Sequence, residues 1–247
     1  MELVYFIVAL VVLGVLYSRM IRREEPSAIG KAQAVVPVVF GVLSMLPSVA
    51  LAILGSFVLK KAGYEGERLP LLIRSFNSAF IAAGLPEETV KLLMMLLALR
   101  VFRSKVRNVY EYILIGAAVG FGFTLLEEFF YGSGSVLTGI IRFLLIGMHM
   151  VFGIIMAKHL GLARYVRITG RGSAAKEYFL AFVIPLLLHT AHDTFTVSNR
   201  FLDAGDDTTQ MIGLVLSFAT LIVMFAVQLK VLLRLRRDTA HYCEMVF

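Results

Sequence analysis

Residues 85 to 100 read LPEETVKLLMMLLALR, an apolar run with Glu87, Glu88 and Lys91 near its start. An ionised side chain in membrane hydrocarbon costs about 2.5 to 3.5 kcal/mol even on a lenient scale, unless it is paired or solvated. Lys91 follows Glu87 by four residues and Glu88 by three, so it can neutralise one of them on the same helix face. Three charges in such a run indicate a chemical use, and the alternative is a helix-capping cluster with an internal ion pair at the membrane interface.

The composition indicates a polytopic membrane protein. The 247 residues are 59% hydrophobic and only 17% charged, with a mean hydropathy of +0.83, a balance that ordinary soluble domains do not show. The net charge of +7 does not indicate nucleic-acid binding, because most Lys and Arg lie in short segments between apolar runs. Cys243 is the only cysteine, which excludes an internal disulfide framework and a cysteine-based metal cluster.

The apolar runs predict an all-α fold with about seven transmembrane helices, since a span needs about 20 apolar residues. An amphipathic stretch at 69–83 predicts one further interfacial or re-entrant helix. Gly84 can end that helix and Pro86 suits the first turn of the next, so we expect a helix to begin inside the membrane. We expect a single domain over 1–247, with its motif-bearing core at about 80–199. The predicted spans are 3–20, 35–59, 80–102, 109–131, 136–158, 177–199 and 211–233.

Basic residues predict the orientation. Most of the 24 Lys and Arg fall in the linkers after the first, third, fifth and seventh predicted spans. By the positive-inside rule, these linkers face the cytoplasm. The N-terminus is then expected outside and the C-terminus in the cytoplasm.

Further ionisable residues occur in the next three predicted spans. Glu127 and Glu128 lie within a turn of the outer end of the fourth span, in GFGFTLLEEFFYG (residues 120–132). His149 is expected near the middle of the fifth span, four residues before Gly153, whose missing side chain allows a neighbouring helix to approach closely. Each residue taken singly is also compatible with an interfacial anchor or a satisfied hydrogen-bonding group.

The sixth predicted span contains HTAHDTF (residues 189–195), in which His189 and Asp193 share a helix face and His192 lies between them. A carboxylate beside an imidazole fixes its tautomer and raises its basicity. Carboxylates with imidazoles suit the activation of water, with one glutamate as general base. The main alternative is a proton-coupled transporter, because intramembrane Glu, His and Asp also form proton relays. The crowding of these residues into one block, without a matching second half, favours an enzyme.

The ordered motifs resemble those of the PrsW-type intramembrane proteases, relatives of the CAAX prenyl endopeptidases and of bacteriocin-processing proteins. They are Glu87-Glu88-x-x-Lys91, Phe123-x-x-x-Glu127, His149-x-x-x-Gly153 and His189-x-x-x-Asp193. The resemblance covers about residues 80–195. It departs from the family pattern at Glu128, where an asparagine is common, and at His192, where an aromatic residue is common.

The resemblance implies an endopeptidase of a prokaryotic plasma membrane that makes the first cut in a single-span membrane substrate, an anti-sigma factor. By position, it implies that Glu87 activates water with Glu88 beside it, and that Glu127, His149 and His189 complete the catalytic site. Lys91, Asp193, Glu128 and His192 are expected to support them. Glu127, His149 and His189 also suit zinc. We slightly favour a reaction without metal, because these ligands come from three helices and include no sequence-local pair.

Overall fold

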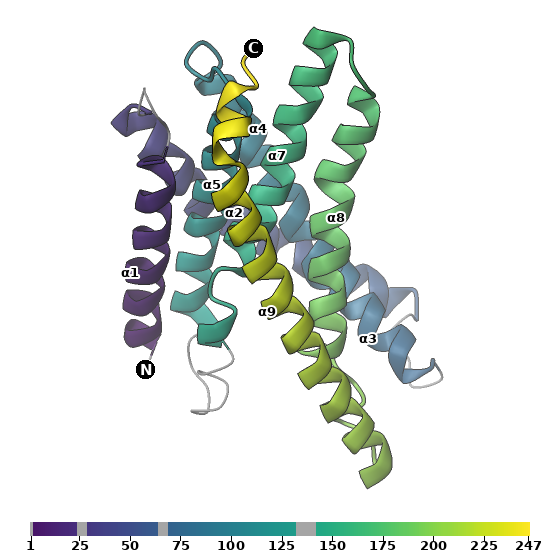
Figure 1. Ribbon diagram of the computed structural model, residues 1–247. Coiled ribbons are helices and arrows are strands. Elements are labelled where there is room, and N and C mark those ends of the chain that lie inside the picture. Colours follow the sequence, from purple (N-terminus) through teal and green to yellow (C-terminus); the bar gives the residue numbers. More distant parts are fainter. Residues whose placement is uncertain (1, 24–28, 64–68, 132–141) are drawn as a thin grey trace.

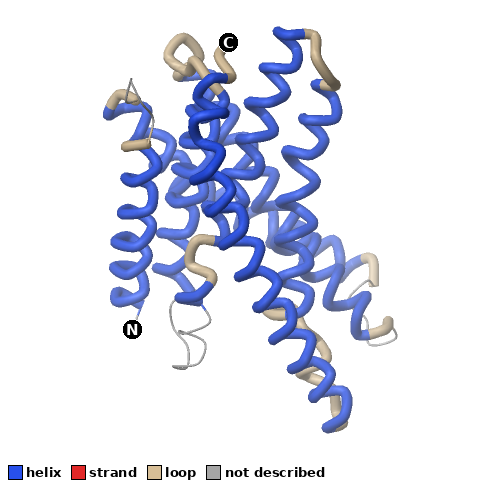
Figure 2. Tube along the Cα trace, in the orientation of Figure 1, coloured by secondary structure: helices blue, strands red, loops and turns tan. Residues whose placement is uncertain are grey.

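Helices form the whole architecture of the computed structural model, which describes residues 2–23, 29–63, 69–131 and 142–247 (Figures 1 and 2). Among these residues, the only β-type pairing is an isolated bridge between Asn108 and Val246. The helices are α1 (Glu2–Ile21), α2 (Lys31–Lys61), α3 (Leu71–Ala79), the π-helix η1 (Phe80–Gly84), α4 (Leu85–Val101), α5 (Val109–Tyr131), α7 (Met148–Thr169), α8 (Ala174–Phe195) and α9 (Asp207–Glu244).

Five described segments are long and apolar enough to cross a membrane: α2, α5, the segment Arg142–Thr169 that contains α7, α8 and α9. The first and third predicted spans are helical but shorter: the apolar part of α1 is Phe6–Ile21, and α4 has 17 residues. The part of the fifth predicted span before Arg142 lies outside the described residues. The N- and C-termini lie at opposite ends of the bundle, as an odd number of crossings requires (Figure 1).

The prediction that Pro86 lies in the first turn of a helix is confirmed, because α4 begins at Leu85, but the expected break in the helix at Gly84 is wrong. Gly84 has helical dihedrals (φ −53°, ψ −53°), and the chain stays helical from α3 through η1 into α4. Pro86 has no N–H to donate, and in an α-helix its ring would clash with a carbonyl of the preceding turn. The chain accommodates it with a wider π turn, in which the Leu85 N–H donates to the Phe80 carbonyl, five residues earlier.

His149 lies in the first turn of α7, which begins at Met148 after a turn at residues 145–147. Its expected position near the middle of the fifth span stays a prediction, because the part of that span before Arg142 lies outside the described residues. The turn places His149 toward the same end of the bundle as Glu127, which lies in the last two turns of α5.

Close helix packing depends on glycines of the central helix α5. A Cβ on Gly116 would collide with the backbone of Gly153 in α7, and a Cβ on Gly122 would collide with the backbone of α2. The expectation that Gly153 permits a close approach is therefore confirmed. Backbones this close bring side chains on α5 and α7 within reach of one another, a packing mode typical of membrane helices.

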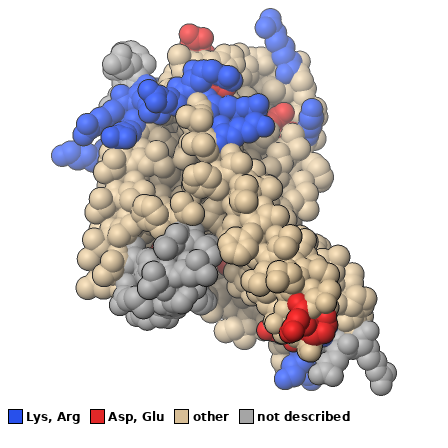
Figure 3. Space-filling view, turned by 60° about the horizontal axis from the view of Figure 1, so that its bottom comes forward, with Lys and Arg blue, Asp and Glu red and all other residues tan. Residues whose placement is uncertain are grey.

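Basic side chains gather at one end of the molecule, above a broad band of uncharged surface (Figure 3). This end holds the C-terminus, the turn after α4 and the connection between α7 and α8 (Figure 1). The arrangement agrees with the linkers that the sequence assigns to the cytoplasm.

Candidate active site

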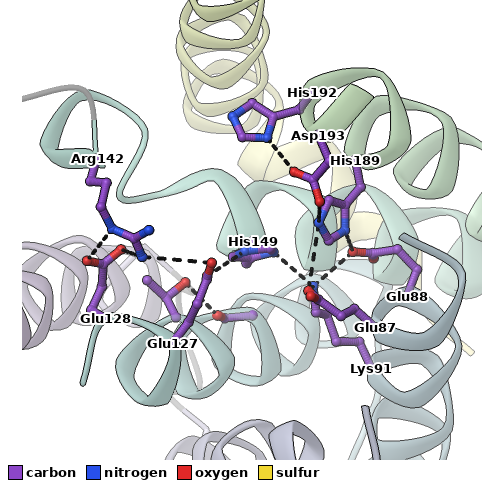
Figure 4. A network of polar contacts seen from close by, with 12 residues as sticks. Glu87, Glu88, Lys91, Glu127, Glu128, Arg142, His149, His189, His192 and Asp193 are labelled. Atoms are coloured by element: carbon purple, nitrogen blue, oxygen red, sulfur yellow. Dashed lines mark hydrogen bonds and ion pairs between the residues drawn. The ribbon is translucent and has the colours of Figure 1, made fainter. Parts of the chain in front are cut away.

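A buried polar cluster joins α4, α5, α7 and α8 inside the bundle (Figure 4). It contains most of the residues that the sequence motifs single out. Its members are Glu87, Glu88 and Lys91 of α4, Glu127 of α5, His149 of α7, and His189 and Asp193 of α8.

Lys91 lies at the centre of the cluster and is 1% exposed. Its Nζ lies 2.9 Å from Glu88 Oε1, 3.4 Å from Glu87 Oε2 and 2.8 Å from His149 Nδ1. The same ammonium stands over the Phe123 ring, 3.8 Å from its centroid. Burying an ammonium is tolerable only with such partners, because the desolvation cost is several kcal/mol.

His189 is held by carboxylates on both sides of its ring. Its Nδ1 lies 2.8 Å from Glu88 Oε1, while its Nε2 lies 3.4 Å from Asp193 Oδ2 and 3.7 Å from Glu87 Oε2. A proton on Nδ1, donated to Glu88, leaves Nε2 facing the carboxylates of Asp193 and Glu87. This is how a carboxylate fixes the tautomer of a metal-binding or catalytic histidine.

His149 connects Lys91 to Glu127. The Lys91 ammonium has only donors, so His149 Nδ1 accepts from it, and the neutral ring carries its proton on Nε2. That Nε2 lies 2.7 Å from Glu127 Oε2 and donates to it. The ring also packs against Phe123, with centroids 4.9 Å apart, which explains why the motif places Phe123 one turn before Glu127.

Exposure separates the glutamates into two kinds. The side chains of Glu87 and Glu127 are 21% and 24% exposed, whereas that of Glu88 is fully buried. Glu88 Oε1 contacts both Lys91 and His189, while its Oε2 has no partner among the described residues. Glu87 and Glu127 are therefore the carboxylates that water can reach, and Glu88 has the geometry of a positioning group.

The remaining predicted supporting residues lie at the edge of the cluster. His192 Nδ1 is 2.8 Å from Asp193 Oδ1, so it holds the carboxylate that faces His189. Glu128 faces away from the histidines and forms a two-pronged ion pair with Arg142, at 2.9 and 3.0 Å (Figure 4).

Arg142 is a site residue that the sequence analysis did not identify. Its guanidinium also lies 3.8 Å from Glu127 Oε1, so it brings a positive charge to an exposed site carboxylate. The available signal was a single arginine within the predicted fifth span, which hydrocarbon does not favour unless it is paired. By contrast, His159 pairs with Glu177 at 2.6 Å and takes no part in the cluster.

The donor set in this cluster suits a metal ion. One ligand atom each from Glu87, His149 and His189 lies within 4.8 Å of the other two. Two imidazole nitrogens and one carboxylate oxygen are a known zinc-binding combination, and Glu88 supplies the carboxylate that orients His189. The sequence predicted Glu127, His149 and His189 as the metal ligands. In the structure the carboxylate that lies close to both histidines is that of Glu87, and Glu127 instead contacts His149.

Comparisons with known proteins agree with the motifs. Residues 31–227 match the family described as "PrsW family intramembrane metalloprotease". A stretch of 121 residues is 32% identical to the protease PrsW of Bacillus subtilis (strain 168), covering 48% of this chain and 54% of that protein. The match thus spans about half the length of this relative. No solved structure matches the chain. Since the family match covers most of its length, the chain belongs to the PrsW family of intramembrane metalloproteases.

Proposed function

We propose that this protein is an intramembrane endopeptidase that hydrolyses a peptide bond of a single-span membrane protein. The observation that carries the proposal is the convergence of Glu87, His149 and His189, from three helices, on one small volume inside the bundle. A carboxylate and two imidazoles that share a partly accessible site are suited to activating water. Membership of the family agrees with this chemistry.

Zinc fits this donor set, and we now favour it over a reaction without metal. Glu87, His149 and His189 would hold the ion once His149 gives up its contact with Lys91 or with Glu127. When bound, the ion supplies a Lewis acid and lowers the pKa of water. Glu88 keeps His189 in the required tautomer through the 2.8 Å contact. Lys91 offsets the negative charge of the two glutamates beside it.

Hydrolysis also needs a group that moves a proton from the attacking water to the leaving amine. Glu127 is the partly exposed carboxylate outside the convergent donor set, and it lies against His149. We assign it this role when Glu87 holds a metal. Without a metal, Glu87 is the base, because it is the partly exposed carboxylate with an oxygen within 4.8 Å of a ring nitrogen of both histidines. In both cases a glutamate activates the water.

We propose a membrane-anchored anti-sigma factor as the substrate, and a cut near the outer leaflet. The support for the side is positional. Glu127 lies near the end of α5 that is opposite the basic residues, and His149 lies in the first turn of α7 at the same end. The basic end is expected to face the cytoplasm, so the polar cluster is closer to the outer surface.

The test uses purified protein reconstituted in liposomes with single-span membrane proteins, including anti-sigma factors, as substrates. Discrete fragments are expected with the wild type and with the isosteric surface control Glu244→Gln, and none with Glu87→Gln. If neither form cleaves any of these substrates, while the wild type alone drives proton-coupled solute uptake, the cluster belongs to a transporter.

A further inference from the structure

A second polar feature lies at the basic end of the bundle, at the opposite end of α4 from Glu87. A cavity of about 420 Å³ opens between α4, α5, α7 and α8. Four arginines line it: Arg100 at the end of α4, Arg103 in the turn that follows, and Arg164 and Arg167 in the last turns of α7. The lining includes no carboxylate.

Three of these arginines have no opposing charge among the described residues, where no carboxylate pairs with the side chain of Arg100, Arg103 or Arg167. All three side chains are exposed. Arg164 is fixed in place instead, because it donates to the Tyr112 hydroxyl at 3.3 Å and stacks on the Phe247 ring at 4.2 Å. Arginines at helix ends also act as topology signals, but that role does not require four of them to line one hollow.

The arginines suit a phosphate group. Guanidinium groups bind phosphate oxygens through paired N–H donors, and several guanidinium groups without a counter-charge repel one another until an anion is bound. Two tyrosines, Tyr112 and Tyr178, add hydroxyls to the lining. The helix ends that carry these residues are at the level where lipid headgroups lie.

The other side of the cavity is apolar. Leu96, Leu99, Leu160 and Ile168 line it, and Leu96 and Ile168 are 43% and 56% exposed on the surface of the bundle. Because this surface contacts lipid in the membrane, the cavity offers an anion-binding site next to a wall that faces hydrocarbon. A ligand that binds both the arginines and the apolar wall carries a phosphate head and an acyl tail.

We propose that this cavity binds the phosphodiester headgroup of an anionic phospholipid, with the acyl chains along the apolar wall of α4 and α7. The bound lipid joins the end of α4, whose start carries Glu87, to the end of α7, whose start carries His149. It therefore ties together two of the helices that form the polar cluster. The proposal does not depend on the peptidase activity.

Lipid binding to the purified full-length chain in neutral detergent tests the proposal. Affinities for phosphatidylglycerol and for phosphatidylcholine with the same acyl chains are measured by native mass spectrometry. The test variant is Arg103→Gln/Arg167→Gln. The matched control is Arg22→Gln/Lys31→Gln, which removes the same charge from exposed positions of the same basic end but outside the cavity.

The wild type is expected to bind phosphatidylglycerol at least about tenfold more tightly than phosphatidylcholine. The cavity variant should lose about tenfold or more of that affinity, and the control less than about twofold. Equal losses in both variants, or no preference for phosphatidylglycerol, would overturn the proposal. Displacement of the lipid by millimolar glycerol phosphate would identify a soluble-phosphate site and overturn the assignment to lipid. Should the double variant not fold, Arg100→Gln alone is expected to weaken phosphatidylglycerol binding about fivefold, and an unchanged affinity would count against the proposal.

Discussion

At the scale of single residues, Glu87 and Glu88 are neighbours with different exposure and different partners. Glu88 is fully buried against Lys91 and His189, while Glu87 is 21% exposed. Removing one partner of a buried ion pair leaves an uncompensated charge, which costs about 3 to 5 kcal/mol. Neutralising Glu87 should therefore affect mainly activity, whereas neutralising Glu88 should also lower stability.

We predict that Glu87→Gln abolishes cleavage and leaves folding nearly unchanged, whereas Glu88→Gln also lowers the free energy of unfolding by about 3 kcal/mol. Thermal unfolding in detergent and fragment formation measure the two effects. The double variant Glu88→Gln/Lys91→Met should recover part of the lost stability, because it removes a buried ammonium that keeps only the longer 3.4 Å ion pair with Glu87 once Glu88 is neutral. A Glu87→Gln protein that cleaves normally would contradict the assignment.

Metal content can also be assigned to particular residues. The wild type is expected to retain about one zinc ion per chain, and His149→Ala or His189→Ala should each lose most of it, because three protein ligands are the usual number in a catalytic zinc site. His241→Ala, in the exposed C-terminal part of α9, is the matched control. Elemental analysis of the purified proteins gives the result. Full activity in zinc-free protein, unaffected by a chelator, would exclude the metal.

Sequence spacing predicted the contacts within one helix and could not predict those between helices. The pairs of Lys91 with Glu88 and of His189 with Asp193 follow from residues three or four apart. The contact of His189 with Glu88 joins positions 101 residues apart, and depends on how α4 and α8 pack. The motif residues lie close together in the structure, but only the geometry shows that Glu87, and not Glu127, shares the small volume with His149 and His189.

At the scale of elements, the continuous helix from α3 through η1 into α4 explains how the charged residues at the start of α4 are placed inside the membrane. Local signals at Gly84 and Pro86 favoured a helix end, yet the wider π turn keeps the backbone hydrogen-bonded where water is scarce. An interruption here would leave polar backbone groups unsatisfied in hydrocarbon. Local propensity therefore did not predict the continuous helix, because the cost of unsatisfied backbone groups in hydrocarbon outweighs the preference of Gly84 and Pro86 for a helix end.

The approach of α5 to α7 gives a prediction about glycine. Gly153→Ala should lower the free energy of unfolding by about 1 to 3 kcal/mol and reduce activity, because the new Cβ would meet the backbone of Gly116 and force the helices apart. Gly14→Ala is the control, since its Cβ would lie 3.9 Å from the Phe121 ring, an ordinary contact. Thermal unfolding of both variants checks this. Equal stability of the two would show that the helices adjust freely.

At the scale of the whole molecule, the termini lie at opposite ends and the basic residues gather at the C-terminal end (Figures 1 and 3). The sequence predicted this distribution because linker charge is a property of composition and needs no packing information. The exact number and limits of the spans were less predictable, since α1 and α4 have apolar segments shorter than a full crossing. The polar cluster lies toward the end opposite the basic residues, which is the end that the positive-inside rule predicts to face outward.

The last prediction is that the polar cluster opens to the extracytoplasmic side. In a background without Cys243, single cysteines are placed at Ala62 and Gly205 near one end of the bundle and at Ser104 and Thr169 near the other, all in exposed positions. Ala62 is preferred to Gly63 as the cysteine position, because the positive φ of 75° at Gly63 would strain a cysteine there. An impermeant thiol reagent on intact cells should label positions 62 and 205 and spare 104 and 169, which become reactive once the membrane is opened. The reverse pattern would place the basic end outside, against the positive-inside rule, and the cut would then fall near the cytoplasmic leaflet, where an extracytoplasmic segment of the substrate is out of reach.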